Sequence, residues 1–343
     1  MPPLIFLLLG APISLELGGS SQLEVSVIGQ LRLIENDRPS GASEVQVNLQ
    51  RLRETLRLYT FDRRLNFGLS VNTTPAVQEF IELSIEGRPA PWLRLRAGLF
   101  KVPFTAYRAQ SYAELSFVDW ATTVTRPFGA EHQVGLELHA AVESWTLVFG
   151  AFGGAPARAA HGLGLAPSFG LSTPNLADLT KLGLPGPLHP ELFTRVSFRS
   201  EPAGLELIGS VAIDLAPEDQ RDLAFRAAPE LRWRGGPAEF TAVFYVGGPS
   251  AAPTQMKGGL AEAQLDVDDG LRLAARWSVL ARDATLVATS GAPKTEEERA
   301  LAIGFRVVGN QLELIGELAH LRDVMEPEPR EQWRARAQLQ GGW

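Results

Sequence analysis

The stretch WLRLRAGLFKVPF, residues 92–104, alternates apolar and basic side chains over its first half. Successive side chains of an extended strand point to opposite faces, so Leu93 and Leu95 would share one face and Arg94 and Arg96 the other. A face of leucines needs an apolar medium, whereas a face of guanidinium groups needs water. The stretch therefore predicts a strand that separates an apolar environment from an aqueous one.

The same alternation recurs along most of the chain. It is clear in LNFGLSVN (65–72), IELSIEG (81–87), VGLELHA (134–140) and LRLAARWSVLA (271–281). A period of two on this scale is typical of strands, and helical periodicity is scarce. The second segment changes face near residues 50–52, where we expect a β-bulge. Dividing the chain at its turn signals gives about sixteen segments, near residues 23–34, 44–59, 64–72, 77–87, 91–101, 133–142, 144–152, 192–201, 203–215, 222–234, 237–247, 257–267, 270–282, 299–308, 311–322 and 331–343.

The connections between these segments alternate between short and long. Transmembrane barrels of the bacterial outer membrane have short turns on the periplasmic side and long loops outside. An even number of strands closes such a barrel and leaves both termini on the periplasmic side. The last segment, QWRARAQLQGGW, ends on an aromatic residue and resembles the C-terminal strand of these barrels. Short turns are expected at 61–64, 88–91, 142–144, 200–204, 234–237, 268–270 and 308–311, with longer connections such as 102–132, 153–191 and 283–298 between them.

These patterns predict an all-β fold, a transmembrane antiparallel up-and-down β-barrel integral to the bacterial outer membrane. The leucine face would meet lipid and the arginine face a water-filled lumen, because a closed barrel pairs every backbone group that lies in hydrocarbon. A large soluble β-protein with a one-sided polar sheet is the alternative that the alternation leaves open.

The N-terminal run LIFLLL (4–9) is too short to span a bilayer as a helix and fits the apolar core of a signal peptide. We expect residues 1–20 to be a signal peptide and N-terminal lead, and residues 21–343 to form a single outer-membrane β-barrel domain. A buried N-terminal strand is the alternative. The absence of cysteine excludes disulfides and cysteine-based metal or redox chemistry, and the net charge of −7 argues against nucleic-acid binding.

Strand parity places many arginines on the expected lumen face. The guanidinium group of arginine stays charged and can donate two parallel hydrogen bonds to the oxygens of a phosphate or carboxylate. Rings of basic residues make pores favour anions. Acids such as Glu82, Glu86 and Glu137 share this face, so pairing that only holds the wall in shape is the alternative for any one arginine. The candidate pore-lining basic residues are Arg94, Arg96, Arg195, Arg199, Arg232, Arg272, Arg276, Arg334 and Arg336.

The connection at 102–132 is too long and too aromatic for a plain hairpin loop, and loops of this length are usually functional. It is the third long connection, and we expect it to fold inward and narrow the pore. An external loop that packs on a neighbouring subunit is the alternative. The candidate constriction residues are Arg108, Glu114, Asp119 and Arg126.

This part of the chain also resembles a known family. AGLFKVPF (97–104), SYAELSFVDW (111–120) and RPFGAEHQVGLEL (126–138) are similar to successive elements of the phosphate-selective porin O and P family of outer-membrane proteins. The resemblance implies a sixteen-stranded, usually trimeric barrel with an inward third loop and a basic lumen. Members that carry phosphate use an arginine ladder and clustered lysines. Here Lys101 is the one lysine of the matching element, so the resemblance supports an unselective or mildly anion-preferring pore as well as a phosphate pore.

The sequence thus predicts a porin for passive diffusion of small hydrophilic solutes, with a preference for anions such as phosphate. Its expected partners are outer-membrane lipid, small anionic or neutral solutes and further copies of itself in a homotrimer, with no nucleic acid. We expect no enzymatic activity, no cofactor and no metal, because no motif such as HExxH or GxSxG surrounds the five histidines. A structural or adhesive barrel with a plugged lumen and a barrel enzyme are the alternatives.

Overall fold

In the computed structural model the described residues are almost all in strands, with one short helix, α2 (Ala106–Ala109). No helix among these residues is long and apolar enough to cross a membrane. The described residues are 13–37, 43–73, 78–111, 115–121, 132–153, 191–215, 225–248, 256–282, 294–307, 312–323 and 330–342.

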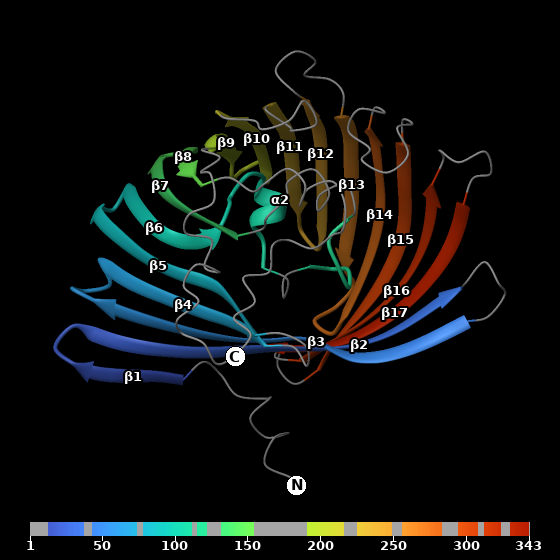
Figure 1. Cartoon of the computed structure of the whole chain (residues 1–343), viewed down its shortest axis with the longest axis horizontal. Coiled ribbons are helices and arrows are strands. Elements are labelled where there is room, and N and C mark those ends of the chain that lie inside the picture. Colours follow the sequence, from blue (N-terminus) through green and yellow to red (C-terminus); the bar gives the residue numbers. More distant parts are fainter. Residues whose placement is uncertain are drawn as a thin grey trace, which may run out of the picture.

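Sixteen strands close into a barrel (Figure 1). Each strand from β2 to β16 pairs antiparallel with the next strand in sequence, and β17 pairs with β2 to complete the ring. The predicted all-β, up-and-down barrel is confirmed. The strands of the ring are β2 (Ser21–Asp37), β3 (Ser43–Thr60), β4 (Leu65–Thr73), β5 (Gln78–Ala90), β6 (Leu93–Lys101), β7 (His132–Val142), β8 (Trp145–Phe152), β9 (Glu191–Ser200), β10 (Leu205–Asp214), β11 (Phe225–Gly235), β12 (Ala238–Gly248), β13 (Met256–Asp266), β14 (Leu271–Arg282), β15 (Lys294–Val307), β16 (Leu312–Asp323) and β17 (Arg330–Gly342).

Most outward side chains of these strands are apolar and exposed. Leu95 is 45% exposed, Leu136 62% and Leu301 64%, whereas the neighbouring Arg96 and Glu137 face each other on the inner side. A soluble sheet would bury such leucines against a core, so the one-sided soluble sheet is excluded in favour of a wall that faces lipid. Exposed aromatic residues form a girdle near the short turns, at Phe67, Trp92, Trp145, Trp233, Phe240 and Phe305.

The two ends of the barrel differ in their connections. At one end, called the turn end below, the strands are joined by short connections such as 61–64, 143–144, 201–204 and 236–237. At the other end, successive strands are separated by more residues in the sequence, as between β6 and β7 and between β8 and β9. β2 begins and β17 ends at the turn end.

The register of β2 and β3 confirms the predicted bulge. Gln30 pairs with Arg51 whereas Leu31 pairs with Leu49, so Gln50 is an extra residue on β3. Such a bulge shifts the inward and outward positions of the strand by one residue. The change of face that the sequence shows near residues 50–52 has this cause.

Part of the expected N-terminal lead, residues 1–20, is in a strand. Ile13–Gly18 form an additional strand, β1, which pairs with β2 beside the ring (Figure 1). Residues 1–12 lie outside the described residues. A signal peptide within residues 1–20 stays a prediction.

Candidate functional site: the barrel interior

β6 stays paired with β7 as far as Lys101, which faces His132, and the chain leaves the wall after this residue. Gly98 has a φ of 120°, and an added Cβ would lie 2.2 Å from the main-chain oxygen of Leu83. Only glycine adopts this backbone conformation at low cost. The alternation of β6 stops after it, since Leu99 and Phe100 are both buried. The described residues that follow, 102–111 and 115–121, are called the inner segment, and they lie inside the ring (Figure 1).

The first part of the inner segment holds α2 against the wall. The Thr105 hydroxyl caps the helix by accepting a hydrogen bond from a main-chain N–H of its first turn at 3.0 Å. The Ala106 N–H donates to Glu230 of β11 at 2.9 Å, and the Tyr107 hydroxyl donates to Glu262 of β13 at 2.6 Å. Burial and the charge of Glu262 raise the pKa of Tyr107 well above its ordinary value, so the hydroxyl keeps its proton and remains a donor.

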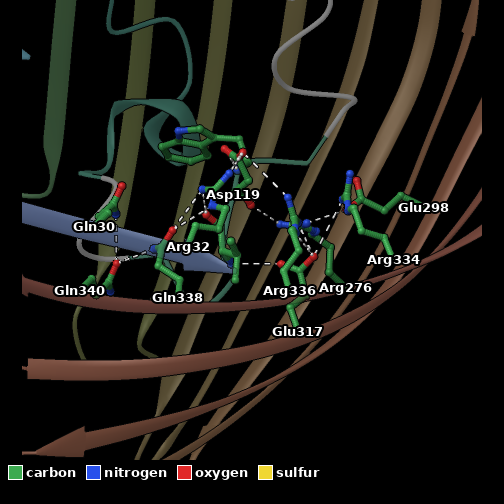
Figure 2. A network of polar contacts seen from close by, with 12 residues as sticks. Gln30, Arg32, Asp119, Arg276, Glu298, Glu317, Arg334, Arg336, Gln338 and Gln340 are labelled. Carbon is green, nitrogen blue, oxygen red and sulfur yellow. Dashed lines mark hydrogen bonds and ion pairs between the residues drawn. The ribbon is translucent and has the colours of Figure 1, made fainter. Parts of the chain in front are cut away.

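Charged side chains of the wall bind the main chain of the second part (Figure 2). Arg32 of β2 donates to the Val118 oxygen at 2.8 Å, and Glu317 of β16 accepts from the Val118 N–H at 3.0 Å. Arg276 of β14 donates to the main-chain oxygen of Asp119 at 2.8 Å. Buried main-chain groups need hydrogen-bond partners, and here the wall supplies them. These charged residues therefore anchor the inner segment.

The inner segment also packs on apolar side chains of the wall. Phe104 and Trp120 belong to one buried cluster with Phe152 of β8 and Tyr245 of β12. The expected polar inner face is therefore wrong for this side of the barrel, because the segment covers apolar residues there and keeps them from water. A second buried cluster joins the segment to small side chains of β14, β15 and β16, and it comprises Phe117, Val118, Ala274, Ala300, Ala302, Ile315 and Ala319.

Asp119 connects the inner segment to ion pairs of the wall (Figure 2). Its carboxylate lies 3.2 Å from Arg32 and 3.9 Å from Arg336 of β17. Arg336 pairs in turn with Glu317. The guanidinium groups of Arg32 and Arg336 are almost fully buried, so screening by water and salt is weak here. The contact couples the position of the segment to the charges of β17 and β2.

The innermost pair of this network is Arg276 with Glu298 of β15. Their nearest atoms are 2.7 Å apart, and the side chains are 0% and 1% exposed. Arg334 of β17 adds a longer contact of 3.6 Å to the same carboxylate. Removing one partner of a buried pair is strongly destabilising, because the other charge is left without compensation. The buried Arg276–Glu298 pair therefore stabilises this part of the interior.

The inner face of β3 to β7, called the uncovered wall, has a different character. Its inward positions carry amides, hydroxyls and charges, and the Thr55 and Ser70 hydroxyls are hydrogen-bonded at 2.9 Å. Arg57 is exposed on this face. The hydrogen bonds described above join the described residues of the inner segment to β2, β11, β13, β14 and β16. On the side of the uncovered wall, Lys101 at the end of β6 donates to the main-chain oxygen of Gln110 at 2.7 Å. The uncovered wall comprises Arg53, Thr55, Arg57, Asn66, Ser70, Asn72, Glu82, Ser84, Glu86, Arg94, Arg96, Glu137 and His139.

Along the wall, arginine side chains lie over acids that are more deeply buried. Arg94 is 31% exposed and lies 2.9 Å from Glu137, whose side chain is 3% exposed. Arg232 is 22% exposed beside Glu230 at 0%. At these two places the guanidinium group is the more exposed partner of its ion pair. Asp119 and Asp266 are reverse cases: Asp119 is 35% exposed beside Arg32 at 6%, and Asp266 is 32% exposed beside Arg272 at 13%.

The structure places all nine predicted pore-lining arginines on the inner side, and each has a partner. Arg195 donates to the main-chain oxygen of Pro103 at 3.0 Å and so belongs to the anchors of the inner segment. The remaining pairs are Arg96 with Glu82, Arg199 with Glu206 at 3.3 Å, Arg272 with Asp266 at 3.0 Å, and Arg334 with Glu317 at 3.9 Å.

The predicted constriction residues have different positions. Asp119 reaches the wall arginines, as described above. Arg108 lies in α2 and is only 4% exposed. Glu114 and Arg126 fall outside the described residues. Among the described residues, no group of three or more histidine, aspartate or glutamate side chains could hold a metal ion.

Sequence reasoning missed two parts of the interior. Glu298 was expected in a loop, because the strand that holds it was predicted to begin at 299; its parity with the inward Ala300 is the signal that could have found it. The glutamines beside the β17–β2 seam were also missed. Gln30 donates to Gln340 at 3.1 Å, and Gln340 donates to Glu313 at 3.0 Å. Their inward parity alone gave no reason to single them out.

Comparisons with known proteins place this architecture among bacterial outer-membrane barrels. No protein-family model matches the chain, and neither does any curated protein sequence. Among solved structures, the anion-selective porin from Comamonas acidovorans is similar with a TM-score of 0.63 at 11% identity, covering 94% of this chain and 100% of that one. The outer membrane channel DcaP of Acinetobacter baumannii has a TM-score of 0.64 at 10% identity, covering 97% and 100%.

A third similar structure is in-vitro folded OmpT, an outer membrane protein of Vibrio cholerae, in its trimer form. Its TM-score is 0.59 at 10% identity, covering 94% of this chain and 99% of that one. At such identities the likeness shows the fold. The chain has the fold of an integral β-barrel of the bacterial outer membrane.

Proposed function

We propose that the protein is an outer-membrane porin that lets small hydrophilic solutes pass by diffusion. The observation that carries this proposal is the uncovered wall, a polar inner face on β3 to β7 where Arg57 is exposed. A solute would pass between this wall and the inner segment. The likeness to the porin from Comamonas acidovorans and to the channel from Acinetobacter baumannii supports this function.

The proposed selectivity is a preference for anions. Its support is the arrangement of Arg94 over Glu137 and of Arg232 over Glu230, which turns positive charge toward the lumen. Phosphate is one possible solute among anions, and the lysine cluster that would favour it is absent from the sequence. The anion preference of the Comamonas acidovorans porin supports the general class of solute.

We further propose that the barrel is a homotrimer without enzymatic activity. The trimer form of the Vibrio cholerae protein supports the first point. The second rests on the structural roles of inner charged residues, since Arg32, Glu317 and Arg276 anchor the inner segment. Arg94 and Glu137 form an ion pair along the wall.

A structural barrel with a plugged lumen is the second candidate. It is favoured by one observation, the two apolar clusters and the buried Arg276–Glu298 pair that fill the side of the interior beneath the inner segment. The two candidates differ in a single measurable property, because a plugged barrel passes no ions.

The test is single-channel recording of the refolded protein in a planar bilayer, with the reversal potential measured under a salt gradient. We expect stable conductance steps and an anion preference. Changing Arg94→Gln together with Arg96→Gln should weaken that preference. The matched control is Arg299→Gln, because Arg299 is paired across β14 and β15 with the outward Trp277. Correctly folded protein that gives no conductance would establish the plugged barrel instead.

A further inference from the structure

The seam between β17 and β2 has a step at the turn end of the barrel. β17 pairs with β2 only as far as Gly342, which faces Ile28. β2 begins seven residues before Ile28, at Ser21, and pairs with β3 down to Gln22, which faces Tyr59. The backbone of residues 21–27 therefore has β3 on one edge, and no described residue of β17 pairs with it on the other edge.

β1 occupies the edge that β17 leaves. Its register runs antiparallel to β2, from Ile13 opposite Val25 to Gly18 opposite Ser21. The connection between the two strands is tight, and Gly18 and Gly19 have φ values of 93° and 62°, which favour glycine. The step at the seam is thus filled by the segment directly before β2 in the sequence.

The side chains of β1 continue the two faces of the wall. Ile13 and Leu15 are 52% and 49% exposed, and they pair with Val25 and Leu23 on the outward side. The next side chain, Ser14, is on the opposite face, where it is hydrogen-bonded to Gln22. An apolar outer face and a polar inner face are what a wall strand needs at the edge of the membrane.

Polar inner contacts extend this match. Arg63, in the turn after β3, pairs with Glu24 at 2.9 Å and also donates to Gln22. Glu24 of β2 lies directly opposite Ser14 of β1. The inner side of the step is therefore a small polar cluster that joins β1, β2 and the β3–β4 turn.

We propose that Ile13–Gly18 is a permanent wall strand that seals the turn end of the β17–β2 seam. In an apolar medium an open strand edge leaves N–H and C=O groups without partners, and β1 removes that cost for the first residues of β2. The proposal keeps residues 13–18 of the expected lead in the mature barrel. Cleavage by a signal peptidase would then take place before Ile13. It concerns the wall alone and stands whether or not the barrel conducts.

The absence of cysteine from the chain makes a disulfide test direct. We would introduce Ser14→Cys with Glu24→Cys, which face each other across β1 and β2. The matched control is Ser14→Cys with Arg57→Cys, since Arg57 faces Glu24 from β3 and lies one strand further away. Expected is an intramolecular disulfide in the folded barrel for the first pair and none for the control.

Each other outcome of this test overturns the proposal. Free thiols in the folded first variant mean that β1 does not sit on β2. Equal cross-linking in both variants means that β1 is not held in one position on β2. A disulfide between two chains means that the edge is filled by another copy.

Two further measurements are independent of conductance. Deleting residues 13–18 should speed amide hydrogen exchange at least tenfold in the folded barrel for those residues of 21–25 whose N–H groups point to β1, and unchanged exchange would contradict the seal. The mass of the protein isolated from outer membranes should include Ile13. A mature chain that begins after Gly18 would overturn the proposal even if the deletion variant failed to fold.

Discussion

Arg276 of β14 donates a hydrogen bond to the main-chain oxygen of Asp119 at 2.8 Å, so a wall arginine holds the inner segment by its backbone. The same guanidinium group pairs with Glu298 at 2.7 Å and lies 4.2 Å from the ring centre of Phe117. One residue thus joins the wall, a buried acid and the segment. Sequence parity alone would assign Arg276 to the lining of the pore, whereas its contacts make it an anchor.

Replacing Arg276 should destabilise the barrel. In Arg276→Met the carboxylate of Glu298 stays buried without its main partner, and we expect the free energy of unfolding to fall by about 3–5 kcal/mol. Urea titration of the barrel in lipid vesicles, followed by tryptophan fluorescence, measures this change. The control is Arg234→Met, whose side chain is 73% exposed beside Glu239 and should matter little. Equal losses in the two variants would contradict the anchoring role.

Removing the charge of Asp119 should increase the preference for anions. Asp119→Asn leaves the main-chain bond from Arg276 in place but removes the carboxylate that lies 3.2 Å from Arg32. We expect the ratio of anion to cation permeability to rise about twofold, since the wall arginines lose a countercharge. Reversal potentials measure the ratio. Asp268→Asn, in the exposed turn before β14, is the control and should leave it unchanged.

A selectivity in Asp119→Asn equal to that of the wild type would show that ions do not pass near Asp119. The proposed path between the inner segment and the uncovered wall would then need to be abandoned.

Gly98 of β6 has a backbone conformation that other residues adopt only at a cost. In Gly98→Ala the new Cβ would lie 2.2 Å from the Leu83 oxygen at a φ of 120°. We expect a loss of at least about 1–3 kcal/mol in the free energy of unfolding and a lower refolding yield. The control is Gly87→Ala on β5, where no atom lies within 4 Å of the added Cβ. Similar yields for both variants would show that the strain is relieved elsewhere.

The fold could be predicted from the sequence because its physical cause is local. A strand between lipid and water alternates side chains, so segments such as LRLRA on β6 and LRLAARWSV on β14 show their environment directly. Even the bulge at Gln50 is visible as a change of face. Residues 13–18 fall within the expected lead of residues 1–20, because the apolar run 4–9 before them fits the core of a signal peptide.

The interior was less predictable because it depends on contacts far apart in the sequence. Arg32 and Asp119 are 87 residues apart, and parity shows only that Arg32 points inward. Whether an inward arginine faces water or the inner segment depends on where the segment lies. The runs TLVFGAF on β8 and AVFYV on β12, apolar on both faces, were the available sign that part of the inner wall is covered.

The most direct test of a conducting path along the uncovered wall uses two single-cysteine variants, Arg57→Cys and Leu56→Cys. Arg57 is exposed on the inner side of β3, and Leu56 is 40% exposed on its outer side. A charged, water-soluble thiol reagent added during single-channel recording should lower the current stepwise in Arg57→Cys and leave Leu56→Cys unchanged. Unaltered current in a fully labelled Arg57→Cys barrel, or no current from either folded variant, would contradict the account.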